Sequence, residues 1–199
     1  MSSKCLPLLI LAALTTAAAL PLSAQSNPSA KTGGWPITIG GGMSVFNMDF
    51  PPGTKNKDYM EGGMIWADLN KIPFVPRQLG IEAEFRDLGL NAPSSEPGLS
   101  SKVFLGGPTY TWRRSRFALD GKGMYGYASI NFSPFGSYSH DTRTIRAVGG
   151  GGQYRLWDGV WARADYEYQW WPTLVSGHPH PNGFTFGLAY DFRNFGRRY

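Results

Sequence analysis

Three histidines, His140, His178 and His180, are the side chains best suited to metal binding or nucleophilic catalysis in this sequence. They fall in segments that we predict to be exposed loops, rich in proline, glycine or serine. Zinc sites gather several Cys, His or carboxylate ligands, and neither a cysteine nor a cluster of carboxylates accompanies these histidines. We therefore predict that they are solvated, that the protein holds no metal and that it is not an enzyme.

Two glycine runs, Gly40–Gly42 and Gly149–Gly152, are the next candidates, because glycine-rich loops can cradle phosphate groups. Neither run is followed by the Lys-Ser/Thr pair and helix of a phosphate loop, so we predict strand kinks there and no cofactor. The net charge of +5 comes without a basic stripe or a binding motif. We accordingly expect no nucleic-acid partner.

The chain begins with MSSKCLPLLILAALTTAAALPLSAQ, in which Lys4 precedes an uncharged apolar run. This order is typical of a secretory signal peptide over residues 1–24, with cleavage after Ala24. The alternative is a transmembrane helix, but Pro7 and Pro21 leave a helix-friendly segment shorter than the roughly 20 residues that a span needs. Cys5 is the only cysteine and leaves with the signal peptide, so we expect no disulfide in the exported chain.

Residues 25–34 are predicted to be a flexible lead-in, and residues 35–199 a single domain. The sequence has 26 glycines, 15 prolines and 15% aromatic residues, and the domain lacks a convincing helical stripe. These features indicate an all-β fold. We predict eight strands, at residues 37–46, 59–69, 78–86, 102–112, 116–130, 143–156, 160–170 and 183–192.

The predicted connections alternate between long and short. The long ones are residues 47–58, 87–101, 131–142 and 171–182, and the short ones are 70–77, 113–115 and 157–159. In an up-and-down barrel all long connections then lie at one end, as in bacterial outer-membrane barrels with short periplasmic turns and long outer loops. The turn at 157–159 contains Asp158-Gly159, a pair that suits a tight turn with positive φ.

The strand faces distinguish a membrane barrel from a soluble one. The segment VWARADYEYQW places Val160, Tyr166 and Trp170 on one face and Arg163 and Glu167 on the other. An eight-stranded barrel has room for little more than its own side chains, so we place the aromatic residues in lipid and the charges in the lumen. The predicted lumen charges are Glu82, Glu84, Arg86, Asp120, Lys122, Arg163, Asp165, Glu167 and Asp191.

Lipid contact requires a closed barrel, because every backbone amide in the membrane needs a partner. We therefore expect the first and last strands to pair. Pro108 falls inside the fourth strand, where it cannot donate a ladder hydrogen bond. We expect a bulge or kink there, and likewise near Gly149–Gly152.

The C-terminal segment TFGLAYDF carries an alternating apolar stripe. Together with the eight strands and the alternating connections, it resembles the small bacterial outer-membrane β-barrel family, the group that includes the OmpA membrane domain and OmpX. The resemblance implies an assembly signal, filled here by Thr185, Gly187, Tyr190 and Phe192, that the barrel-assembly machinery reads. Members of the family often stop at the final aromatic residue, so either Phe192 or Tyr199 ends the signal here.

The expected protein is an outer-membrane β-barrel with a structural or surface-interaction role, such as adhesion or ligand binding by its loops. Its expected partners are outer-membrane lipid, the barrel-assembly machinery and an unidentified extracellular ligand. We expect paired charges to plug the lumen. The alternatives are a secreted lipocalin-like barrel that carries a hydrophobic ligand and a narrow porin.

Overall fold

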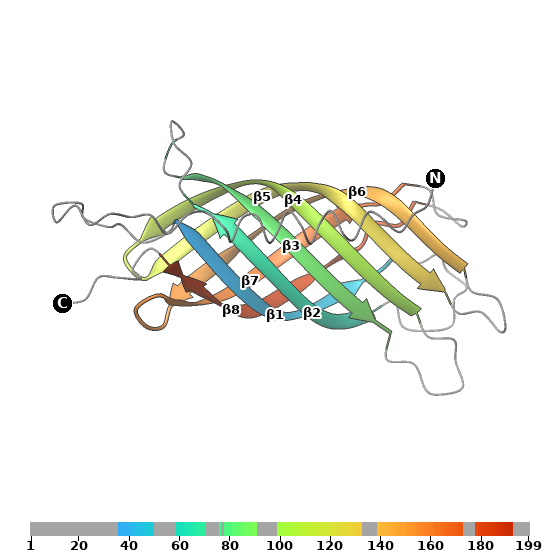
Figure 1. Ribbon diagram of the computed structural model, residues 1–199, viewed down its shortest axis with the longest axis horizontal. Helices are drawn as coiled ribbons and strands as arrows, with labels where there is room; N and C mark the ends of the chain where they lie inside the picture. The colour runs from blue at the N-terminus through green and yellow to red at the C-terminus, as the bar shows by residue number, and fades with distance from the viewer. Residues whose placement is uncertain are drawn as a thin grey trace, which may run out of the picture. The chain divides into compact units, whose positions relative to one another are not determined.

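A computed structural model describes residues 36–49, 59–70, 76, 78–90, 99–132, 139–172 and 178–192. The predicted signal peptide and lead-in lie outside these residues. The described chain forms eight antiparallel strands that follow one another around a closed barrel (Figure 1). The strands are β1 (Ile37–Asn47), β2 (Tyr59–Leu69), β3 (Leu79–Gly89), β4 (Leu99–Arg114), β5 (Phe117–Phe132), β6 (Ser139–Arg155), β7 (Val160–Trp170) and β8 (Asn182–Asp191). Within the described segments, no helix is long and apolar enough to span a membrane.

Pairing of β1 with β8 closes the barrel, as predicted. The two strands run antiparallel, with Thr38 opposite Asp191 and Asn47 opposite Asn182. Every strand thus has a neighbour on both sides, which is the condition for placing a sheet in lipid. We refer to the end with the β1–β2, β3–β4, β5–β6 and β7–β8 connections as the outer end, and to the other as the inner end.

Strand bounds agree with the prediction for β2 and β7 and differ most at the outer end. There β6 begins at Ser139, β4 begins at Leu99 and β3 continues to Gly89. Polar and glycine residues led us to end these strands early, but backbone pairing continues through them. The predicted strict alternation of loop lengths is therefore wrong at one place, because connections 70–78 and 90–98 are equally long.

We expected a bulge or kink at two places, and neither has a bulge. The β4–β5 ladder skips Gly107 and Pro108, yet its register is the same on both sides of the gap, with Gly106 opposite Tyr125 and Thr109 opposite Lys122. Because Pro108 has no N–H, the ladder loses bonds there without gaining a residue. The Gly149–Gly152 run likewise stays in register with both β5 and β7.

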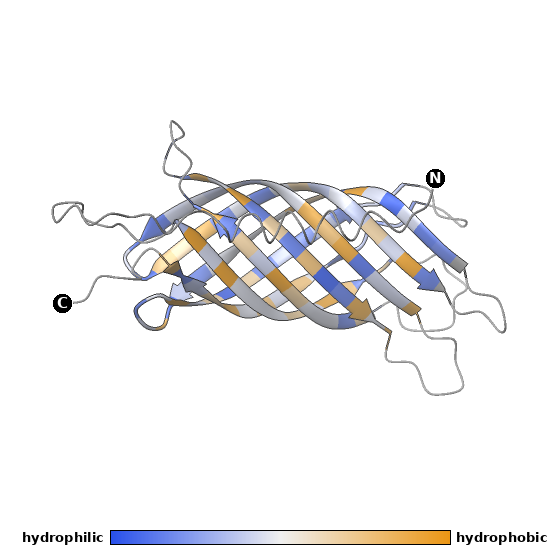
Figure 2. Ribbon diagram, viewed as in Figure 1, coloured by the Kyte–Doolittle hydropathy of each residue, from blue (hydrophilic) through white to orange (hydrophobic). Residues whose placement is uncertain are grey.

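Side chains alternate between lipid and lumen along the strands, which Figure 2 shows as orange and blue residues following each other. Large apolar side chains cover the outside of the wall, for example Ile65 with 62% and Phe186 with 59% of its surface exposed. The charged side chains of Glu82, Glu84 and Arg86 on β3, and of Arg163, Asp165 and Glu167 on β7, point inward and are buried. A soluble carrier would need the opposite arrangement, so the lipocalin-like alternative is wrong.

Candidate functional site

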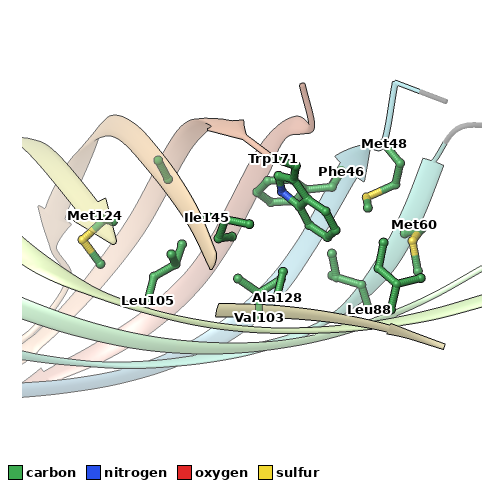
Figure 3. Close-up of a cluster of buried hydrophobic side chains, with 12 residues drawn as sticks. Phe46, Met48, Met60, Leu88, Val103, Leu105, Met124, Ala128, Ile145 and Trp171 are labelled. Atoms are coloured by element: carbon green, nitrogen blue, oxygen red, sulfur yellow. The ribbon is translucent and has the colours of Figure 1, made fainter. Parts of the chain in front are cut away.

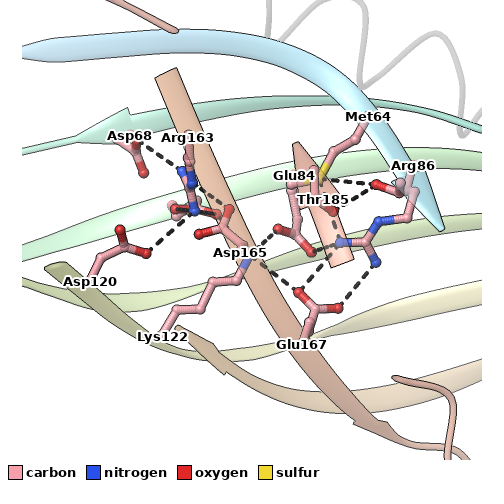
Figure 4. A network of polar contacts seen from close by, with 12 residues as sticks. Met64, Asp68, Glu84, Arg86, Asp120, Lys122, Arg163, Asp165, Glu167 and Thr185 are labelled. Atoms are coloured by element: carbon pink, nitrogen blue, oxygen red, sulfur yellow. Dashed lines mark hydrogen bonds and ion pairs between the residues drawn. The ribbon is translucent and has the colours of Figure 1, made fainter. Parts of the chain in front are cut away.

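A network of buried ion pairs lies in the inner half of the lumen (Figure 4). It is built on inward positions of β2, β3, β5 and β7, where every second residue points away from lipid. Three cations, Arg86, Lys122 and Arg163, contact six carboxylates, those of Asp68, Glu82, Glu84, Asp120, Asp165 and Glu167.

Arg163 on β7 binds the carboxylates nearest the inner end. Its guanidinium donates to Glu82 at 2.9 Å and to Asp165, and lies 3.5 Å from Asp68. It also lies 5.0 Å from the ring centroid of Trp66, a cation–π distance. Arg163 therefore connects β7 to both β2 and β3 across the lumen.

Lys122 and Arg86 continue the network toward the outer end. The Lys122 ammonium lies 2.6 Å from Glu84 and 3.2 Å from both Glu82 and Glu167. Arg86 pairs with Glu84 at 3.0 Å and with Glu167 at 3.1 Å. Ion pairs with this little solvent access are strong only as a connected set, because each charge has lost its hydration.

All nine predicted lumen charges lie inside the barrel, but they do not form one group. Asp191 stands apart at the inner end, where Arg113 pairs with it at 3.2 Å. We missed Asp68, which is buried in the network. It lies two residues after Trp66 on the inward face of β2, so the period of that strand could have identified it.

The outer half of the lumen is apolar, which we did not predict. Phe46 and Trp171 pack there with methionine and aliphatic side chains (Figure 3). The other members of this apolar cluster are Met48, Met60, Leu88, Val103, Leu105, Met124, Ala128, Ile130, Ile145 and Ala147. We expected paired charges to plug the lumen, whereas small closed barrels can hold inward side chains of either kind.

Hydrogen bonds join the apolar cluster to the ionic network. Trp171 Nε1 donates to Gln169 Oε1 at 2.7 Å, and Gln169 Nε2 donates to Glu167 at 2.7 Å. The guanidinium of Arg86 lies 4.3 Å from the Phe46 ring centroid. The two halves of the lumen therefore form one continuous set of contacts.

Two inward glycines make room for the large lumen side chains. A Cβ on Gly40 would lie 2.3 Å from the Trp66 ring, and one on Gly149 would lie 3.0 Å from the Lys122 side chain. Side-chain volume in the lumen accounts for glycine at these two positions.

Strands β4, β5 and β6 are longer than the others, with 16, 16 and 17 residues against 10 or 11. The extra residues of β5 and β6 lie at the outer end, where Asn131 pairs with His140. β7 ends opposite Arg146, so residues 139–145 of β6 extend past it. We call residues 126–132 and 139–145 the projecting hairpin.

A family profile described as "Outer membrane protein beta-barrel domain" matches residues 9–192. The chain belongs to this outer-membrane β-barrel family. The family and the lipid-facing exterior identify an integral protein of the outer membrane. Among curated protein sequences, none matches.

Solved outer-membrane barrels share the fold. Neisserial surface protein A aligns with a TM-score of 0.61 at 14% identity, covering 78% of this chain and 96% of that one. The attachment invasion locus protein Ail of Yersinia pestis aligns with a TM-score of 0.55 at 21% identity, covering 78% and 96%. OprG of Pseudomonas aeruginosa aligns with a TM-score of 0.55 at 13% identity, covering 78% and 95%.

The proposed assembly signal of this outer-membrane barrel lies on both faces of β8 and on Phe192, the residue after it. Thr185 is buried, and its hydroxyl lies 2.7 Å from that of Ser44. Gly187 is half-buried beside Trp66. Tyr190 faces lipid and packs edge-to-face on Phe192, with ring centroids 4.9 Å apart. Recognition by the assembly machinery remains a prediction, and Tyr199 lies outside the described residues.

The histidines are not brought together. His140 lies on β6 rather than in a loop, and its ring contacts Asn131 at 2.5 Å and Thr142 at 3.1 Å. His178 and His180 precede β8, where His180 stacks on Tyr168. Among the described residues, no group of three or more His, Cys, Asp or Glu side chains is arranged to hold a metal ion.

Proposed function

We propose that this outer-membrane barrel is a surface-interaction protein, with a filled lumen that does not conduct and a projecting hairpin that contacts an extracellular partner. The observation that carries the proposal is the extension of β5 and β6 beyond β7. A membrane anchor alone does not need strands of this length, since about 9–11 residues cross the bilayer.

The chemistry of the projecting hairpin suits contact with a polar partner. Beyond Tyr127, its lipid-side face carries Ser129, Asn131, His140 and Thr142 in place of the aromatic residues found lower on the wall, and His140 hydrogen-bonds to the other three. Within the described residues, the β6 edge over 139–145 has no strand beside it on the β7 side. An edge of this kind can bind an extended segment of another protein by adding a strand. One relative in fold is Ail, the attachment invasion locus protein of Yersinia pestis.

The burial of the inward side chains supports a non-conducting barrel over the narrow-porin alternative. Arg86, Glu84 and Glu167 are each 2% exposed or less, and so are Phe46 and Met60 at the outer end. Passage of a hydrated ion would require both the ionic network and the apolar cluster to rearrange. We expect no steady current when the purified barrel is inserted in a planar bilayer, and a steady current would favour the porin.

Shortening the hairpin tests the interaction. Ala128 lies opposite Arg143, so an Asn-Gly turn joining them would close the hairpin and delete residues 129–142. Cells with the complete barrel should adhere to immobilised laminin, fibronectin or collagen or to cultured epithelial cells, and cells with the shortened barrel should not. Asp141→Asn, which removes only the exposed ion pair with Arg143, is the control for surface charge.

Heat-dependent gel migration would show that both barrels are assembled. Equal adhesion by the two kinds of cell, or no adhesion by cells with the complete barrel, would count against the proposal.

A further inference from the structure

A group of arginines lies at the inner end of the barrel. Arg114 ends β4, Arg116 lies in the turn before β5, and both are exposed. Arg113 has a different role, because it points into the lumen and pairs with Asp191 at 3.2 Å. Among the described residues, Arg114 and Arg116 make no ion pair. Two uncompensated guanidinium groups are therefore available on the outside of the wall.

Aromatic side chains surround these arginines on the lipid side. Arg114 pairs with Phe117 in the β4–β5 ladder. The Phe117 ring lies 4.9 Å from that of Tyr154, and Trp112 is exposed beside them. Aromatic residues at the ends of the apolar band mark the headgroup level of a membrane barrel. Arg114 and Arg116 therefore lie at the level of phospholipid phosphates.

Further along the same side of the wall, four outward positions of β5 and β6 carry no side chain. These are Gly121, Gly123, Gly150 and Gly152, which we call the glycine lane. A Cβ added to Gly121 or Gly123 would meet nothing within 4 Å. On the β5 side the lane is bordered by exposed Leu119 and Tyr125. An acyl chain can approach the backbone more closely here than where large side chains cover the wall.

We propose that this side of β4–β6 binds an anionic phospholipid of the periplasmic leaflet, with Arg114 and Arg116 holding its phosphate and the glycine lane receiving an acyl chain. The guanidinium fork matches two phosphate oxygens. With no described carboxylate paired to either arginine, the site favours a lipid with net negative charge over a zwitterionic one. The short-turn end faces the periplasm in this family, so the ligand is a phospholipid of that leaflet.

Native mass spectrometry of the purified full barrel in mild detergent tests the site. The probes are phosphatidylglycerol and phosphatidylcholine with identical acyl chains. A basic residue near an anionic headgroup contributes roughly fivefold in affinity, so the unaltered barrel should prefer phosphatidylglycerol about 25-fold. The double variant Arg114→Gln/Arg116→Gln should lose this preference. Arg143→Gln, which changes an exposed arginine at the outer end, should keep it.

The glycine lane is tested by Gly121→Leu, because the open space at this position lets the barrel fold with the larger side chain. We expect it to weaken binding of both lipids about equally and to leave the headgroup preference unchanged. The proposal is overturned if the double variant keeps the preference or if Arg143→Gln loses it equally. Unchanged lipid binding by Gly121→Leu would remove the acyl-chain part of the site.

Discussion

Arg86 and Glu167 meet at 3.1 Å inside the lumen, although they come from strands on opposite walls of the barrel, β3 and β7. Glu84 lies 3.0 Å from the same guanidinium, and Lys122 lies 3.2 Å from Glu167. The contact spans the lumen at this level. It also makes the two walls dependent on each other, since neither charge has water to replace its partner.

Replacing Arg86 with methionine should destabilise the barrel by about 3 kcal/mol, because two buried carboxylates lose a partner. Urea unfolding in detergent micelles, followed by tryptophan fluorescence, would measure the loss. Lys102→Met is the matched control, since the Lys102–Asp87 pair is exposed and 3.9 Å long. Such pairs contribute at most about 1 kcal/mol. Equal losses of unfolding free energy for the two variants would show that the buried lumen pair stabilises the barrel no more than the exposed pair does.

Gly159 should not tolerate a side chain. It has a φ of 82° in the β6–β7 turn, as the Asp158-Gly159 pair predicted, and a Cβ there would lie 2.9 Å from the Tyr190 ring. We expect Gly159→Ala to lower the unfolding free energy by about 1–2 kcal/mol. Gly63→Ala is the control, because a Cβ at Gly63 meets nothing within 4 Å. The same urea titration compares them, and equal midpoints would contradict the expectation.

Leu188 faces lipid on β8 with 54% of its surface exposed. Leu188→Arg should cost about 2–4 kcal/mol if the position lies near the bilayer midplane, and should sharply reduce the heat-modifiable barrel in membranes. Leu188→Met keeps an apolar side chain and should assemble normally. Normal assembly of the arginine variant would place Leu188 at the headgroup level instead.

Tyr190→Ala tests the assembly signal. Tyr190 and Tyr166 both face lipid with similar exposure, 37% and 42%, but only Tyr190 lies in the proposed signal. Tyr190→Ala should therefore slow insertion by the assembly machinery more than Tyr166→Ala does, while unassisted folding into lipid vesicles should be similar for both variants. Equal insertion rates with the machinery present would argue against a signal at Tyr190.

The apolar stripe of β8 and the charged face of β7 could be predicted from the chain because they depend only on local geometry. Successive side chains of a strand point to opposite faces, so Tyr166 and Glu167 must lie on opposite faces of β7. Because lipid surrounds the barrel and the lumen has little room, the apolar face must point outward and the charged face inward. The eight strands follow in the same way, since turn residues separate segments that are long enough to cross a bilayer.

Contacts across the lumen depend on how the strands are staggered, and only closure of the barrel determines them. The contacts of Arg163 with Asp68 and Glu82 and the apolar outer lumen around Phe46 arise from residues far apart in sequence that meet only when β1 pairs with β8. The length of β6 also depends on tertiary structure, because backbone pairing with β5 continues the strand through polar residues such as His140. Side-chain periodicity contains no information on these contacts, since it repeats along each strand regardless of which strands lie across the lumen.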